Sequence, residues 1–211
     1  MFEASARSVP GSLHPFEDRV LVDEKRGLFA VADGVTGSSQ GSGAVAAELA
    51  LELLQREFSG KVVAAIQEVH KTVVERRMDD RTIGETTLTV ASVEGNLLQV
   101  GNLGDSPAYL VRSGLMRRLT TEDISPTGHI TQVIGYPETV RVHSEEVQLQ
   151  KGDLVVLASD GVGHVLRPTF MVPLVDERNT ARIADKIVDG ARHMATDYDD
   201  DKSVIVLRFT Q

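Results

Sequence analysis

The stretch Phe29-Ala30-Val31-Ala32-Asp33-Gly34 decides how the rest of this chain is interpreted. Its four apolar residues predict a buried strand, and Gly34 predicts a sharp turn directly after Asp33. The pattern returns at Leu154 to Gly161, where a second apolar run ends in Asp160. A carboxylate at the end of a buried strand loses hydration and needs a donor or a cation nearby. Two such strands suggest a shared metal ion, although either Asp-Gly pair alone could be an ordinary turn.

The composition excludes several classes of function. The chain has 211 residues, of which 41% are hydrophobic and 25% are charged, and this predicts one domain over residues 1–211. It contains no cysteine, which excludes thiol catalysis and zinc-thiolate sites. A net charge of −9 disfavours a nucleic-acid partner. We find neither a leader nor an apolar run of ~20 residues, and we therefore expect a cytoplasmic protein without a membrane partner.

The periodicity of apolar residues predicts strands, then two helices, more strands, a third helix and a last strand. Short connections between the middle strands predict an antiparallel meander, so we expect an α+β fold in which helices pack on antiparallel sheet. The first 16 residues should be extended or irregular. We expect helices at 44–58, 62–77 and 179–191, a hairpin of 20–22 with the strand at 29, and strands at 86–93, 97–103, 108–111, 115–119, 140–149, 153–159 and 203–209.

Acidic residues are repeatedly found at predicted strand ends or turns, beside a glycine or another acid. Ligands that are all oxygen favour Mg²⁺ or Mn²⁺ over zinc. Two such ions would offset four negative charges, acidify a bound water and direct it at a phosphorus centre. The acids are Glu17, Asp18, Asp33, Asp105, Asp160 and the cluster Asp199, Asp200 and Asp201.

Seven short motifs occur in an order that resembles the metal-dependent type 2C serine/threonine protein phosphatase family. The resemblance covers nearly the whole chain. The motifs are Glu17-Asp18-Arg19, Asp33-Gly34-Val35-Thr36-Gly37, Gly84-Glu85-Thr86-Thr87, Gly104-Asp105-Ser106, Leu119-Thr120 with Glu122-Asp123, Ala158-Ser159-Asp160-Gly161 and Asp200-Asp201-Lys202-Ser203-Val204.

The resemblance implies a four-layer α-β-β-α sandwich with two central antiparallel sheets and a binuclear Mg²⁺ or Mn²⁺ site between them. It implies hydrolysis of phosphoserine or phosphothreonine in a protein substrate by a water that bridges the two ions. The substrate would be a phosphoprotein. The segment between Thr121 and Ile134, which is short for the family, and the Asp200-Asp201 pair make the chain similar to the compact bacterial branch of sporulation-stage and stress-response phosphatases, which act on phosphoserine in small regulatory proteins.

The resemblance also assigns roles to the acids, position by position. Asp33 would bridge both metals and the Gly34 carbonyl would complete the coordination. Catalysis would depend on Asp18, Asp33 and Asp160. The metal ligands would be Glu17 and Asp18 on one side, Asp160 and Asp200 on the other, and Asp105 at the position used for a third metal. Asp200 is preferred to Asp199 and Asp201 because the family places its ligand first in the final acidic pair.

The main departure from the family concerns how the phosphate is bound. Leu13 stands where an arginine commonly clamps the phosphate, and Arg7, Arg19 and His14 are the candidates to replace it. Other departures are Val35 and Thr36 for His-Gly or Met-Gly, Pro107 for an arginine and Ile124 for a histidine.

Two other functions fit parts of the sequence. Gly37 to Gly41 matches the Gly-x-Ser-x-Gly elbow, which would make Ser39 the nucleophile of an α/β-hydrolase. Five residues separate Asp33 from Ser39, too many for a sharp elbow. The other alternative is a phosphatase fold that binds a partner without turnover, and the missing arginine favours it.

Overall fold

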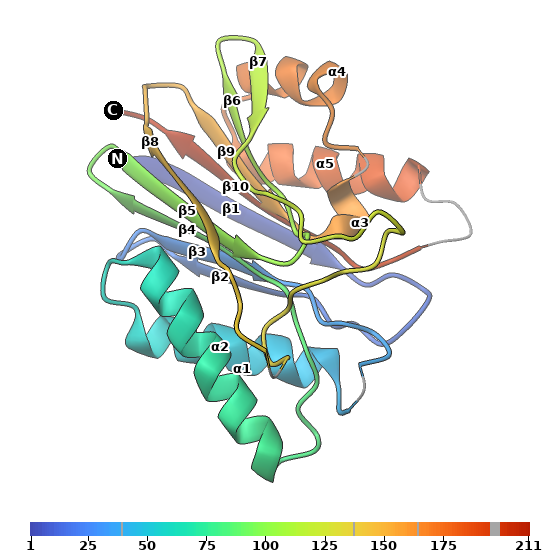
Figure 1. Cartoon of the computed structure of the whole chain (residues 1–211). Helices are drawn as coiled ribbons and strands as arrows, with labels where there is room; N and C mark the ends of the chain where they lie inside the picture. The colour runs from blue at the N-terminus through green and yellow to red at the C-terminus, as the bar shows by residue number, and fades with distance from the viewer. Residues whose placement is uncertain (39, 137, 164, 195–198) are drawn as a thin grey trace.

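The computed structural model describes all residues except 39, 137, 164 and 195–198. Two five-stranded antiparallel sheets lie face to face, and helices cover the outer face of each (Figure 1). In spatial order, one sheet contains β1 (Phe2–Val9), β10 (Lys202–Phe209), β9 (Leu154–Ala158), β6 (Ala108–Arg112) and β7 (Leu115–Arg118). The other contains β2 (Arg19–Asp23), β3 (Leu28–Ala32), β4 (Leu88–Glu94), β5 (Leu97–Leu103) and β8 (His143–Gln148).

Two long helices, α1 (Gly43–Glu57) and α2 (Val62–Asp79), cover the sheet that contains β3. The other sheet is covered by α5 (Thr180–Met194) and the short segments α3 (Asp160–Gly163), α4 (Pro168–Met171) and η1 (Val172–Asp176). The predicted α+β sandwich of four layers is therefore confirmed.

Three separate apolar cores correspond to the three interfaces between the four layers. In β3, Leu28, Ala30 and Ala32 face the helices α1 and α2, whereas Phe29 and Val31 face the opposite sheet. β9 has the same double burial, with Val155 and Leu157 between the sheets. Because side chains alternate along a strand, Asp33 continues the row of Phe29 and Val31 into the space between the sheets.

The predicted hairpin of β2 and β3 is confirmed, with Arg19 opposite Ala32. The predicted meander is wrong between β5 and β6, because these strands belong to different sheets. The chain crosses between the sheets at Gly104, whose φ of +106° suits glycine, and this crossing carries Asp105. A hairpin turn and a crossing both need short polar residues and glycine, so the sequence does not distinguish them.

Smaller differences concern the ends of elements. The first residues, expected to be extended or irregular, form strand β1, which pairs with β10. The strand expected from residue 140 begins at His143, and the segments α3, α4 and η1 were not predicted.

The two termini meet at one end of the sandwich, where the Thr210 amide donates to the Met1 carbonyl at 2.9 Å. The predicted site lies at the opposite end, beyond the last residues of β3 and β9 (Figure 1). There α1 begins very close to the turn after β3. A Cβ added to Gly43 would lie 2.5 Å from the carbonyl carbon of Gly34. Glycine at both positions therefore permits the helix to start against the Asp33 turn.

Gly43→Ala is expected to lower the free energy of unfolding by about 1 to 3 kcal/mol, because the added methyl group must push α1 away from Gly34. Chemical denaturation of the metal-free protein measures this change. Val45→Ala, in the same turn of α1 but 39% exposed, is the matched control and should have a much smaller effect. Equal effects of the two substitutions would contradict the close approach as the reason for glycine.

Candidate metal centre

Acids from distant parts of the chain gather around one cavity of about 600 Å³ at the end of the sandwich. Among the described residues that line it, none is a lysine or an arginine. The lining residues are Leu13, His14, Asp33, Gly34, Val35, Thr36, Thr87, Asp105, Gly128, His129, Ile130, Asp160 and Asp200. The structure thus brings together five of the seven predicted metal ligands in the wall of this cavity.

Asp33 directly follows β3, and Asp160 is the first residue of α3, just after β9. The two meet at the end of the sandwich, where Asp33 is half-buried and Asp160 is exposed. The Asp160 amide lies 3.5 Å from Oδ2 of Asp33. Burial raises the pKa of Asp33 well above its usual value, and the carboxylates of Asp18 and Asp160 raise it further. Loss of water raises the pKa of Asp160 to about 6, with added repulsion from Asp200. Among the described residues, neither carboxylate forms an ion pair with a lysine or an arginine, so nothing there offsets the cost of ionising it.

Asp18 lies behind the cavity wall and is 1% exposed. Its Oδ2 accepts a hydrogen bond from the Ser159 hydroxyl at 2.7 Å, whereas its buried Oδ1 has no partner among the described residues. Burial raises the pKa of Asp18 to about 7, against the effect of the Ser159 hydrogen bond. An unpaired buried carboxylate oxygen is costly, and a bound cation or its water would satisfy it.

Glu17 is the other predicted ligand that does not line the cavity. Its Oε2 accepts a hydrogen bond from Thr36 at 2.6 Å, and its Oε1 lies 3.4 Å from the Ala44 amide in the first turn of α1. Glu17 thus links the Asp33 turn to α1, and its remaining lone pairs can hold a metal-bound water.

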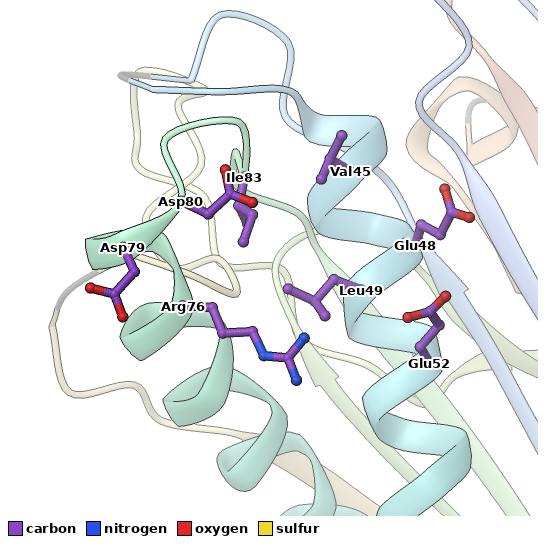
Figure 2. A pocket seen from close by; sticks show the side chains of 8 residues that line it. All are labelled: Val45, Glu48, Leu49, Glu52, Arg76, Asp79, Asp80 and Ile83. Carbon is purple, nitrogen blue, oxygen red and sulfur yellow. The ribbon is translucent and has the colours of Figure 1, made fainter.

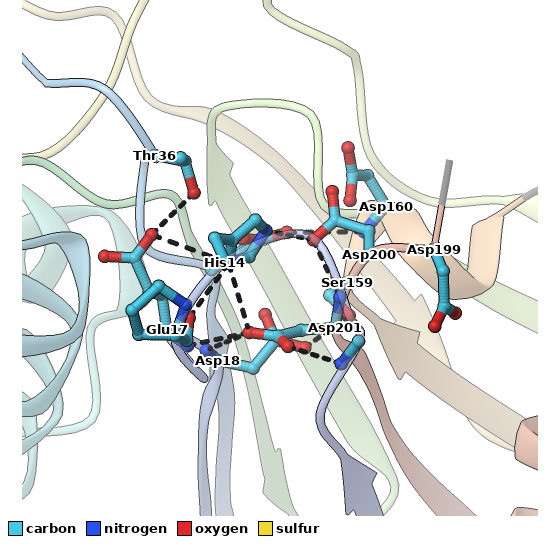
Figure 3. Close-up of polar contacts among 12 residues, drawn as sticks. His14, Glu17, Asp18, Thr36, Ser159, Asp160, Asp199, Asp200 and Asp201 are labelled. Carbon is cyan, nitrogen blue, oxygen red and sulfur yellow. Dashed lines mark hydrogen bonds and ion pairs between the residues drawn. The ribbon is translucent and has the colours of Figure 1, made fainter. Parts of the chain in front are cut away.

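The final acidic residues have three different environments (Figure 3). Asp199 pairs with the buried Lys202 at 2.5 Å, and Asp200 lines the cavity. Asp201 is 2% exposed and accepts hydrogen bonds from backbone amides of Gly11 and Glu17 at 2.8 and 2.7 Å. Asp201 therefore anchors the loop that carries the Glu17-Asp18 pair, whereas Asp200 is the member that faces the cavity.

Asp105 lines the main cavity and also a neighbouring one of about 390 Å³ that it shares with Asp160. Burial raises its pKa, and the charge of Glu122 contributes. Its place beside Asp160 suits the predicted third metal position.

A second acidic hollow differs from this cavity because it contains an arginine. It lies between α1 and α2, is lined by Glu48, Glu52, Asp79 and Asp80, and contains Arg76, whose guanidinium group points toward α1 (Figure 2). None of the predicted ligands lines it. The cavity at the sheet ends has a comparable set of acids without an arginine or lysine among its described lining residues. Its oxygen donors therefore fit hard divalent cations such as Mg²⁺ or Mn²⁺.

Comparison with known proteins identifies the family. The model of the family described as Stage II sporulation protein E (SpoIIE) matches residues 23–210. The chain belongs to this family. The serine/threonine phosphatase Stp of Listeria innocua is similar to this SpoIIE-family chain, with 28% identity over 191 residues that cover 74% of the chain and 75% of the relative. The resemblance to the type 2C phosphatases is thereby confirmed.

Solved structures of phosphatases have the same fold as this SpoIIE-family member. The crystal structure of PstP from Mycobacterium tuberculosis has a TM-score of 0.84 at 22% identity and covers 100% of this chain and 99% of its own. The catalytic domain of PstP in complex with two manganese ions has a TM-score of 0.83 at 23% identity, with coverage of 100% and 99%. Within the described residues, no helix combines the length and apolar character that crossing a membrane requires.

Several residues that shape the centre receive no supporting role from the sequence pattern. Ser159 donates to Asp18, Thr36 donates to Glu17, and the Thr87 hydroxyl accepts the Asp33 amide at 3.1 Å. Each is next to, or part of, a recognised motif, and that proximity was the only available signal. Ser39, the candidate nucleophile of the elbow, lies outside the described residues.

Substitutions of Asp200 and Asp201 should distinguish the residue that binds metal from the residue that anchors the loop. Asp201→Ala leaves buried backbone amides without their acceptor. It should lower the free energy of unfolding, measured with chelator present, by about 1 to 3 kcal/mol. Asp200→Ala should have a smaller effect on stability but should weaken Mn²⁺ binding, measured by calorimetry. Equal destabilisation of the chelated protein by both substitutions would contradict this division of roles.

The stability of the metal-free protein should depend on pH. The raised pKa values of Asp18 and Asp160, about 7 and about 6, mean that the folded chain binds more protons than the unfolded chain between about pH 4 and these values. The free energy of unfolding should therefore fall as the pH rises from 5 to 8. Urea denaturation in chelator measures the slope, and Asp160→Asn should reduce it. A slope that Asp160→Asn leaves unchanged would rule out this origin.

Proposed function

We propose that this protein is a metal-dependent phosphatase that hydrolyses phosphoserine or phosphothreonine in a protein substrate. The observation that carries the proposal is the cavity where Asp33, Asp160 and Asp200 converge with no lysine or arginine among its described lining residues. The similarity to Stp, a serine/threonine phosphatase, supports the same chemistry. The two manganese ions in the PstP complex support a binuclear centre of Mn²⁺ or Mg²⁺.

Each acid of the centre would have a distinct role in holding the two ions. Asp33 would lie between two ions, with Asp160 and Asp200 on one of them and Glu17 and Asp18 on the other or on its waters. When bound, the ions supply an activated water and offset the charge that develops on the phosphate. The positions of Asp33 and Asp160 are fixed before any ion binds, because each follows a strand, β3 or β9, that is buried on both faces of its sheet.

The substrate reaches the centre beside the loop that precedes β8. This loop contributes Gly128, His129 and Ile130 to the cavity wall. The neighbouring cavity of about 390 Å³ continues from Asp105 and Asp160 toward Tyr109 and Ile124, and offers room for residues that flank a phosphoserine. A small regulatory phosphoprotein is the substrate class we propose. A cytoplasmic location and full activity of residues 1–211 as one domain belong to the same proposal.

The alternatives have less support. An esterase centred on Ser39 needs a parallel α/β-hydrolase sheet, whereas all the strand pairs found here are antiparallel among the described residues. A binding module without turnover remains the relevant rival because Leu13 lines the cavity in place of an arginine. The leucine side chain offers a phosphate neither a positive charge nor a hydrogen-bond donor.

Hydrolysis of p-nitrophenyl phosphate with Mn²⁺, with and without chelator, tests the proposal. We expect activity that chelation abolishes. Asp33→Asn or Asp160→Asn should reduce this activity by more than about 100-fold, because loss of a metal ligand should cost more than the roughly 10- to 100-fold lost with a residue that only hydrogen-bonds to a ligand. Ser39→Ala is the control and should retain activity. Full turnover in chelator would exclude the metal mechanism, and tight Mn²⁺ binding with no turnover on phosphopeptides would favour the binding module.

A further inference from the structure

One imidazole lies among the acids of the centre. The ring of His14 is 12% exposed and lies 2.8 Å from Oδ1 of Asp200, through Nε2 (Figure 3). Its Nδ1 is 3.8 Å from Oε2 of Glu17 and 4.0 Å from Oδ2 of Asp201. His14 therefore contacts or approaches carboxylates from both sides of the predicted centre.

His14 differs from the other two candidates for the missing phosphate clamp. Arg7 pairs with Asp185 at 3.6 Å outside the cavity. Arg19 donates to the backbone carbonyls of Phe16 and Asp18 at 3.2 and 2.9 Å. Only His14 lines the cavity, yet both of its nitrogens already face oxygen acceptors, the second being the Pro15 carbonyl at 2.9 Å. Its ring has no N–H left for a phosphate.

The two oxygens of Asp200 are in different situations. Oδ1 lies next to Nε2 of His14 and also accepts the Asp201 amide at 2.7 Å. Oδ2 makes no hydrogen bond to any described residue and keeps some exposure, and the Asp200 side chain lines the cavity. Two donors on one oxygen fix the rotation of the carboxylate, because either bond would be lost if the group turned. The free oxygen is then held available to a ligand in the cavity.

We propose that His14 is a positioning residue of the metal centre: it holds Oδ1 of Asp200 so that Oδ2 stays available to a divalent ion. This inference rests on the proposed metal site and extends it to a residue that the family resemblance does not assign. Partners of this kind orient a metal-binding carboxylate or imidazole, and their loss typically weakens metal binding by about 10- to 100-fold.

Calorimetric titration of the metal-free protein with Mn²⁺ tests this role without any substrate. His14→Leu removes the donor and should weaken Mn²⁺ binding at one site by about 10- to 100-fold. His14→Gln places an amide N–H near the position of Nε2 and should restore affinity to within about 3-fold of the original, since the hydrogen bond to Asp200 is kept. His129→Leu, at the other histidine that lines the cavity, is the matched control and should bind Mn²⁺ as the unmodified protein does.

Other results would overturn the proposal. Unchanged Mn²⁺ affinity in His14→Leu would show that the contact with Asp200 is only structural, and equal losses in His14→Leu and His14→Gln would show that the hydrogen bond is not what matters. A directly coordinated nitrogen in the electron spin-echo spectrum of bound Mn²⁺, lost in His14→Leu, would make His14 a ligand instead. Failure of phosphatase turnover with normal Mn²⁺ binding would affect only the proposed function.

Discussion

Mutual repulsion of carboxylates in a partly dehydrated space is the constraint on which this structure depends. Asp18, Asp33 and Asp160 all have raised pKa values, because burial and neighbouring acids oppose their ionisation. Such an arrangement opposes folding at neutral pH unless a cation offsets it. The double burial of β3 and β9 holds Asp33 and Asp160 together, whereas Ser159 and the loop anchor Asp201 hold Asp18 beside them.

Neutral donors hold several of the acids around the centre. Backbone amides bind Asp201, and hydroxyl groups bind Glu17 and Asp18. Neutral donors orient a carboxylate without taking the place of a metal ion, whereas an arginine inside the cavity would compete with it. The hollow between α1 and α2, by contrast, has Arg76 among the acids that line it (Figure 2).

The acidic triplet near the C-terminus shows how three chemically identical neighbours acquire different tasks. Asp199 binds the buried Lys202, Asp200 faces the cavity and Asp201 anchors the loop before β2. Successive residues entering β10 point in different directions, so adjacent side chains meet different layers of the sandwich. The packing of the layers also brings His14, 186 residues earlier in the sequence, next to Asp200.

The sequence by itself determined the layered α+β fold, the two buried strands and most of the acids at the cavity, since alternation, Asp-Gly turns and ordered motifs are local signals. It did not determine that β5 and β6 belong to different sheets, that Asp18 and Glu17 lie behind the cavity wall, or that His14 contacts Asp200. Those features arise from contacts between segments up to 186 residues apart. No local pattern records which side chain a distant segment will meet, and only the packing of the two sheets decides it.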